Sequence, residues 1–359
     1  MLLISMLALG AVLTQPPVSA SSRACADYTA ATNARPVVTP ASSLLRVVRR
    51  VTLPESGPAA VQGIRSLDMR ADGTMLLVDS RQPRVSLRTA SLGLTSILGR
   101  EGSGPGEYRI PIQGWFSSSG DIWVLDMNAA RLQAYTASGT YRKSVPGMPL
   151  DARVAFELTD SSFLIVGPTR TPRGNHVATA FRYNGQQAWN SVLLDPRVLE
   201  LDLIVDGAWA TRLRDGSAVV GMSVVPDVTQ IDATTGAIRC RSRIPAAFWR
   251  QLTARERPRN ATLAVLRQWI EAASVARVAV ALPDGGFIVE IEGGAKGTES
   301  PRRSWVMFDA RLAPHQVVDD VPGRILRTKG DTLLAIDDEA ADGVAIHYLV
   351  FTAPIGVRR

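Results

Sequence analysis

The sequence predicts an all-β fold, a six-bladed β-propeller, from three observations. A tight-turn signal followed by a short apolar segment recurs six times along the chain. Strand-like segments flank each recurrence, so that a repeat holds about four short strands, as a propeller blade does. The last repeat lacks one strand, which the segment 44–53 can supply from the other end of the chain. A β-sandwich or two small β domains is the alternative, because these folds also contain regularly spaced short strands.

The recurring segments begin with Asp-Gly or an equivalent polar pair and continue into apolar, β-branched residues. Asp and Gly favour tight turns, so each pair is expected to close a hairpin with the strand before it. The six segments are 72–79, 120–126, 160–167, 215–221, 284–290 and 330–337.

Two irregularities complete the expected ring. In the longest interval, Leu263, Leu266, Trp269 and Ile270 recur near the helical period, which predicts a helical insertion at about 246–273, between blades four and five. After the sixth segment there is room for only one more strand, at 345–351. Pairing it with 44–53 would close the ring and leave no aggregation-prone edge in that blade.

The N-terminus predicts export. Residues 1–13 are apolar and precede the small-residue site at 18–20, which is typical of a signal peptide. The run is too short to cross a bilayer, and a buried N-terminal helix is the alternative. We therefore expect a signal peptide at 1–20, a leader at 21–43 and the propeller at 44–359. The mature chain is expected in the periplasm or outside the cell, without a transmembrane anchor.

The two cysteines, Cys25 and Cys240, are expected to form a disulfide, since disulfides are stable in exported proteins. The alternative is a pair of unrelated thiols. A bridge would fasten the leader to the outer edge of blade four.

The composition narrows the class of partner. The formal net charge is +7, but the arginines are scattered and no aromatic-basic stripe accompanies them, so nucleic-acid binding is not expected. A basic surface favours anionic partners at the level of weak steering. The sequence does not predict an oligomeric state.

An acid and an arginine stand five residues apart in two of the repeats, as Asp79 with Arg84 and Asp126 with Arg131. The glycine-rich segment 99–108 between these repeats contains Gly-Pro-Gly-Glu-Tyr. These features resemble NHL-type six-bladed propellers, in particular exported bacterial members. The resemblance is specific over about 60–145 and weak in the later repeats, which lack the acid-to-arginine spacing. It implies the fold more strongly than an activity, because one scaffold serves many functions.

Four acids fall at strand ends that the expected fold gathers at one end of the ring: Asp79, Asp126, Glu290 and Asp337. Together they could bind a cation such as Ca²⁺ or Zn²⁺, or hold a basic ligand. The structural alternative is that these acids cap turns and pair with Arg84 and Arg131. The segment 99–108, the helical insertion and a loop with His176 share this end, which makes Glu107, Tyr108 and His176 further candidates.

No catalytic motif accompanies these residues. NHL-type lyases are metalloenzymes that gather histidines around the channel, whereas the three histidines here fall at different positions within their blades. The sequence lacks a Gly-x-Ser-x-Gly elbow and a His-Glu-x-x-His pair. We therefore expect an exported binding or scaffold module for a protein, peptide or glycan partner. A metal-assisted hydrolase or lyase is the alternative, and a sensor piece of a larger assembly is not distinguished from the first.

Overall fold

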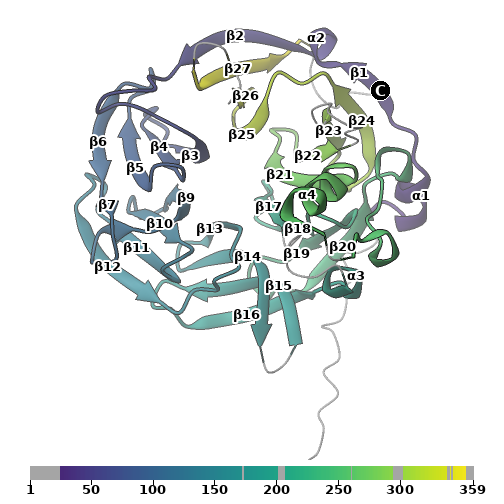
Figure 1. Cartoon of the computed structure of the whole chain (residues 1–359), viewed down its shortest axis with the longest axis horizontal. Helices are drawn as coiled ribbons and strands as arrows, with labels where there is room; N and C mark the ends of the chain where they lie inside the picture. Colours follow the sequence, from purple (N-terminus) through teal and green to yellow (C-terminus); the bar gives the residue numbers. More distant parts are fainter. Residues whose placement is uncertain are drawn as a thin grey trace, which may run out of the picture.

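Six blades, each with four antiparallel strands, form a closed ring, as the sequence predicts (Figure 1). The computed structural model describes residues 25–171, 174–200, 207–259, 261–293, 302–337, 340 and 343–352. The predicted signal peptide lies outside these residues. Within them, no helix has the length and apolarity of a membrane span.

Each blade runs from its first strand, at the centre, to its fourth strand, at the rim. Blade one contains β3 (Ile64–Met69), β4 (Met75–Asp79), β5 (Arg84–Arg88) and β6 (Leu94–Leu98). Blade two contains β9 (Pro111–Phe116), β10 (Ile122–Asp126), β11 (Arg131–Tyr135) and β12 (Tyr141–Pro146). Blade three contains β13 (Val154–Thr159), β14 (Ser162–Thr171), β15 (Gly174–Arg182) and β16 (Gln187–Leu193).

The other three blades follow the same order. Blade four contains β17 (Ala208–Arg212), β18 (Ala218–Met222), β19 (Asp227–Ile231) and β20 (Ile238–Arg243). Blade five contains β21 (Ser274–Ala281), β22 (Phe287–Gly293), β23 (Arg302–Phe308) and β24 (Pro314–Asp319). Blade six contains β25 (Arg324–Lys329), β26 (Thr332–Asp337) and β27 (Ala345–Phe351), and β2 (Leu45–Thr52) completes it.

The predicted hairpin turns form for a local reason. In three of them the aspartate side chain accepts a hydrogen bond of 2.8–2.9 Å from the backbone N–H two residues later. The next residue is a glycine with φ between 82° and 93°, a conformation that costs glycine little. The three turns are Asp72-Gly73, Asp215-Gly216 and Asp284-Gly285.

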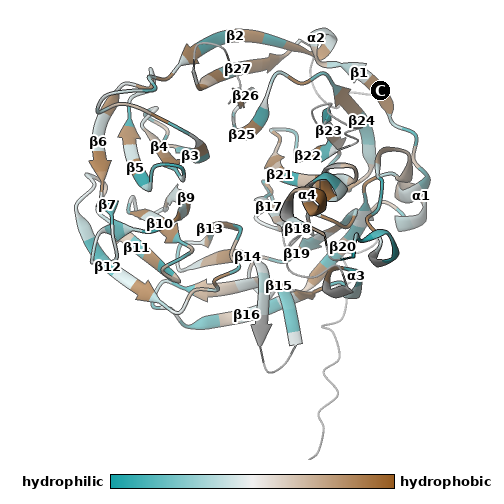
Figure 2. Ribbon diagram, in the orientation of Figure 1, coloured by the Kyte–Doolittle hydropathy of each residue, from teal (hydrophilic) through white to brown (hydrophobic). Residues whose placement is uncertain are grey.

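The core lies between blades. The described residues form six apolar clusters, one between each pair of neighbouring blades. Phe287 and Phe308 stack at 4.8 Å in the cluster that blades four and five share. Figure 2 shows apolar residues along the middle strands of the blades. Because a blade buries its faces only against its neighbours, the ring is stable as a whole.

The two ends of the described chain close the ring. β2 pairs antiparallel with β27, with Leu45 opposite Phe351 and Thr52 opposite Ala345. This confirms the predicted closure of the sixth blade by the N-terminal strand.

The leader wraps around the rim before it reaches blade six (Figure 1). It contains α1 (Tyr28–Asn33), β1 (Val37–Pro40) and α2 (Ala41–Leu44). β1 pairs in parallel with β24, which gives blade five a fifth strand. This strand was not predicted from the sequence.

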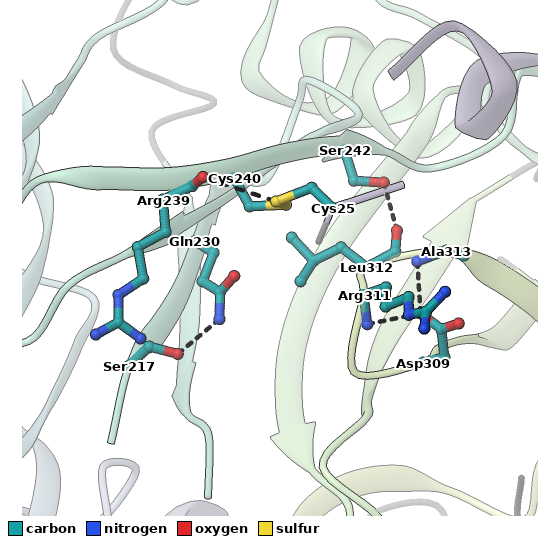
Figure 3. The surroundings of a disulfide bond; sticks show 10 residues. All are labelled: Cys25, Ser217, Gln230, Arg239, Cys240, Ser242, Asp309, Arg311, Leu312 and Ala313. Carbon is teal, nitrogen blue, oxygen red and sulfur yellow. Dashed lines mark hydrogen bonds between the residues drawn. A yellow bond between two sulfur atoms is a disulfide. The ribbon is translucent and has the colours of Figure 1, made fainter. Parts of the chain in front are cut away.

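The predicted disulfide joins Cys25 of the leader to Cys240 on β20 (Figure 3). Backbone bonds support the bridge, since the Ala26 N–H donates to the Arg311 carbonyl at 2.8 Å. The Ser242 hydroxyl donates to the Leu312 carbonyl at 2.6 Å and links blade four to blade five beside it.

The helical insertion is also confirmed. It contains η3 (Ala246–Phe248), η4 (Ala254–Glu256) and α4 (Leu263–Glu271). The Thr262 side chain accepts from the Val265 N–H at the start of α4. Trp269 and Ile270 pack against the cluster between blades three and four. Two other links carry short elements, α3 (Pro196–Glu200) before blade four and the parallel pair β7 (Arg100–Glu101) and β8 (Glu107–Tyr108) before blade two.

Candidate functional site

The ring has two chemically different ends. We call the end with the links between blades and the loops between second and third strands the link face; it includes the segment 99–108 and α4. The opposite end, with turns such as Asp72-Gly73, is the turn face. The sequence placed every candidate residue on the link face.

In blade two the acid and the arginine hold the incoming link. Asp126 is fully buried, and its carboxylate accepts from the backbone N–H groups of Arg109 (3.1 Å) and Ile110 (2.8 Å). Arg131 donates to the carbonyls of Ser103 (2.9 Å) and Glu107 (2.6 Å) and lies 3.6 Å from Asp126. The pair therefore satisfies both kinds of backbone group in the link.

Blade one repeats this arrangement. The Asp79 carboxylate, 1% exposed, accepts from the Gln62 N–H at 2.7 Å and from two N–H groups of the following loop. Arg84 donates to the carbonyls of Pro58 and Ala60. The spacing that resembles NHL-type propellers therefore describes a structural clamp, in agreement with the structural alternative.

Glu290 occupies a different position from the two aspartates. Asp79 pairs with Ile64, before the β-bulge of its blade, whereas Glu290 pairs with Val278, after the corresponding bulge. Because successive side chains alternate between the faces of a strand, this offset turns Glu290 towards blade six. There it accepts from the Ile325 N–H at 2.7 Å. The predicted match in position was wrong for Glu290.

Glu290 should make stability depend on pH. Desolvation raises its pKa from 4.5 to about 7, and Arg303, at 3.6 Å, offsets this only in part. The folded state therefore binds more protons than the unfolded state between these values, and stability falls as pH rises from about 4.5 to about 7, by about 3 kcal/mol. We expect Glu290→Gln to remove this decrease in urea unfolding at pH 5 and pH 8. An unchanged decrease would contradict the assignment to Glu290.

The four acids do not converge on the centre of the ring. Asp79, Asp126 and Glu290 are buried in their blades, and Asp337 lies half-buried at the end of β26. None of them lines the central channel. In the described ranges, no group of three or more His, Cys, Asp or Glu side chains is placed to hold a metal ion. The prediction that these acids gather at the channel mouth is corrected accordingly.

The remaining candidates also serve the scaffold. Glu107 forms an ion pair with Arg100 at 2.7 Å and accepts from the Gly104 N–H at 2.8 Å, and these interactions lower its pKa. Tyr108 is fully buried between blades one and two, which corrects its placement on the accessible face. His176 is half-buried on β15, where desolvation lowers its pKa. None of the three lines the channel.

The central channel has a volume of about 390 Å³ and is lined by the first strands of all six blades. Among the described residues that line it, positive charge predominates, with six arginines and two acids. The arginines are Arg65, Arg153, Arg212, Arg277, Arg324 and Arg327, and the acids are Asp68 and Glu157.

The charges at the turn face are matched. Asp68 forms an ion pair with Arg327 and accepts from the Phe116 N–H at 2.8 Å. Glu157 accepts from the N–H (2.8 Å) and the hydroxyl (2.8 Å) of Ser118. Both acids of the channel lie at this end.

The link-face end of the channel has four arginines from four blades. Arg277 forms an ion pair with Glu292 at 2.8 Å, and Arg324 donates to the Ile64 carbonyl at 2.6 Å. Arg153 lies 3.2 Å from the Met127 sulfur. Arg65 is exposed to the channel, and desolvation and the charges of Arg324, Arg153 and Arg277 lower its pKa.

The sequence-based prediction did not include these four arginines, because the repeat was recognised from the second strands of the blades. Each arginine lies near the beginning of a first strand. An alignment on the first strands would have shown the recurrence. Arg65 and Arg277 also occupy β-bulges, and a bulge redirects side chains without leaving a mark in the sequence.

Comparisons with known proteins extend the fold but not the site. A member of the DUF4221 family from Bacteroides vulgatus superposes with a TM-score of 0.63 at 12% identity, over 87% of this chain and 99% of that one. A putative exported protein from Bacteroides fragilis superposes with a TM-score of 0.62 at 9% identity, over 88% of this chain and 97% of that one. A gluconolactonase from Xanthomonas campestris superposes with a TM-score of 0.52 at 12% identity, over 88% of this chain and 94% of that one. No family model matches the sequence, and no curated protein matches it either.

Proposed function

We propose that this chain is an exported binding propeller that holds a peptide or glycan chain, free or as part of a protein partner, in its central channel. The channel carries the proposal, because the first strands of all six blades line a space of about 390 Å³. That volume is near the lower end of the range of small-molecule sites, about 300–1,000 Å³. It suits one extended chain, while a folded partner would rest on the link face.

Export is supported by several features together. A disulfide is stable in an oxidising compartment, and this chain has one between Cys25 and Cys240. The apolar run at 1–13 has the composition of a signal sequence. A structurally similar protein from Bacteroides fragilis is described as a putative exported protein. The acid-arginine clamps of blades one and two support the NHL-type relationship.

A variant that fills the channel tests this function. Gln113 lines the channel from β9 and is half-buried, so Gln113→Trp places a large ring in the ligand space. We expect its binding to the peptides or glycans that the mature, oxidised wild type selects from arrays to fall at least about tenfold in calorimetry, because the occupied space excludes the ligand.

Gln186→Trp is the matched control, since Gln186 is exposed in the turn between β15 and β16 and should tolerate the same substitution. Equal binding by wild type and Gln113→Trp would show that the ligand lies outside the channel. A wild type that selects no peptide or glycan would contradict the proposed ligand class.

The metal-assisted hydrolase or lyase is less well supported, because three of its four acids are occupied by backbone N–H groups inside the blades. A cation that binds only the folded state must raise its thermal stability. We expect Ca²⁺ or Zn²⁺, followed by chelator, to leave the melting temperature of the protein unchanged. A rise that chelator reverses, and that Asp126→Ala and Glu290→Ala abolish, would restore the metal site.

A further inference from the structure

We propose that the link-face end of the channel is an oxyanion site, which binds a carboxylate, phosphate or sulfate group of the ligand through Arg65, Arg153, Arg277 and Arg324. This inference rests on the proposed function and assigns a chemical class to the ligand in the same channel.

Positive charge converges at the link-face end of the channel. The four arginines come from blades one, three, five and six and line one channel. Desolvation and the charges of the other three lower the pKa of Arg65, so these three guanidinium groups lie within electrostatic range of Arg65. Among the residues that the structure describes, no carboxylate offsets this repulsion at Arg65. An arginine stays protonated in a protein, so the repulsion persists until an anion enters.

The Arg65 side chain has no structural role in its blade. Arg88, in the same blade, is a structural arginine, for it is 1% exposed and donates to Ser86, Leu92 and Ala59. The Arg65 side chain is exposed to the channel and forms no hydrogen bond or ion pair in the described part of the chain. Blade one therefore contains both a buried arginine that stabilises the fold and an exposed arginine whose side chain does not.

The two ends of the channel differ in how their charges are matched. At the turn face, Asp68 matches Arg327, and Arg212 donates to the Glu157 carbonyl at 3.4 Å. At the link face, Arg277 and Arg303 share Glu292 at 2.8 Å and 3.0 Å. The buried Glu290 lies within electrostatic range of Arg324, so the four arginines outnumber the acids near them. An anionic group is therefore drawn towards the link-face end, where the excess positive charge lies.

The guanidinium groups of the channel match the geometry of an oxyanion. A guanidinium group presents paired N–H donors in one plane, which match two oxygens of a carboxylate, phosphate or sulfate. Glu292 accepts from the Nε–H of Arg277, an interaction that holds this side chain in place. The Ile64 carbonyl does the same for an Nη of Arg324. Side chains held in this way lose less conformational freedom when a ligand binds.

Calorimetry and thermal melts with simple anions test the site. The mature, oxidised protein is titrated with inorganic phosphate, sulfate and glucuronate, and with glucose as a neutral probe, while chloride keeps the ionic strength constant. We expect saturable binding of at least one anion and none of glucose. Phosphate and glucuronate distinguish a phosphorylated ligand from a carboxylated one, because the tighter anion identifies the group.

Arg65→Gln is the decisive variant, and Arg153→Gln is the second one in case the first does not fold. We expect each to weaken anion binding at least about tenfold, as expected from the loss of a charged hydrogen-bond donor. Arg65→Gln should also melt at the same or a higher temperature than the wild type without anion, because it relieves repulsion. Arg212→Gln, at the turn face of the same channel, is the matched control and should bind anions as the wild type does.

Two results would overturn the inference: no anion that binds better than chloride, or equal binding by Arg65→Gln, Arg153→Gln and Arg212→Gln. The proposed function is judged separately by Gln113→Trp. If that variant loses a neutral peptide or glycan while phosphate, sulfate and glucuronate do not bind, the channel is a ligand site without an oxyanion site.

Discussion

Asp126→Ala is expected to lower the free energy of unfolding by about 3–5 kcal/mol, as for removal of one partner from a buried charge pair. The substitution leaves the N–H groups of Arg109 and Ile110 without their acceptor in the buried link. It also leaves Arg131, of which 13% of the side chain is exposed, without the neighbouring carboxylate. Urea unfolding of the oxidised protein at neutral pH measures the loss.

Two variants in the same blade separate the causes. Asp126→Asn keeps an oxygen that can accept one N–H, so it should lose less stability than the alanine variant. Asp121→Ala removes a surface ion pair with Arg142 at 2.7 Å, for which a loss below about 1 kcal/mol is expected. If Asp126→Ala were as mild as Asp121→Ala, the clamp would not hold the link.

Removal of the disulfide has the second large effect. Cys25 and Cys240 are 215 residues apart, so the bridge closes a long loop in the unfolded chain. In the chain-entropy description, its loss lowers the free energy of unfolding by roughly 5 kcal/mol. We expect the double variant Cys25→Ala/Cys240→Ala to unfold at a lower urea concentration. Its dependence of free energy on urea should be steeper, because the unfolded chain exposes more surface.

A reducing agent supplies the control for this variant. It should destabilise the wild type and leave the double variant unaffected. If the variant and the oxidised wild type unfolded at the same urea concentration, the leader would contribute to stability through β1 and α1 alone.

The fold could be predicted from the sequence because it depends on short-range signals. Segments such as Asp72-Gly73 and Asp215-Gly216 carry their turn chemistry in adjacent residues, and six of them fix the number of blades. The helix α4 was visible in the spacing of Leu266, Trp269 and Ile270. The closing strand β2 followed from counting the strands of the sixth repeat.

The site could not be predicted in the same way, because it depends on register and on distant pairing. Glu290 lies one residue nearer to its turn aspartate than Asp79 does, and this offset, which the alignment on apolar segments overlooked, turns it to the other face of its strand. The four channel arginines are far apart in the chain, and their proximity follows only from the closed ring. β1 was missed because four residues in a parallel pair with a strand near the other end of the chain give no local pattern.

The path of the leader determines the order in which the strands of the ring can pair during folding. β1 and β2 are synthesised first, but their partners β24 and β27 are synthesised last. The first strands therefore cannot pair until nearly the whole chain has been made. Contacts between such distant residues slow folding, and a strand without its partner invites aggregation during the delay. The oxidation of Cys25 must likewise wait for Cys240. A nascent chain of this protein therefore passes through its most vulnerable stage with five blades in place and the sixth still open.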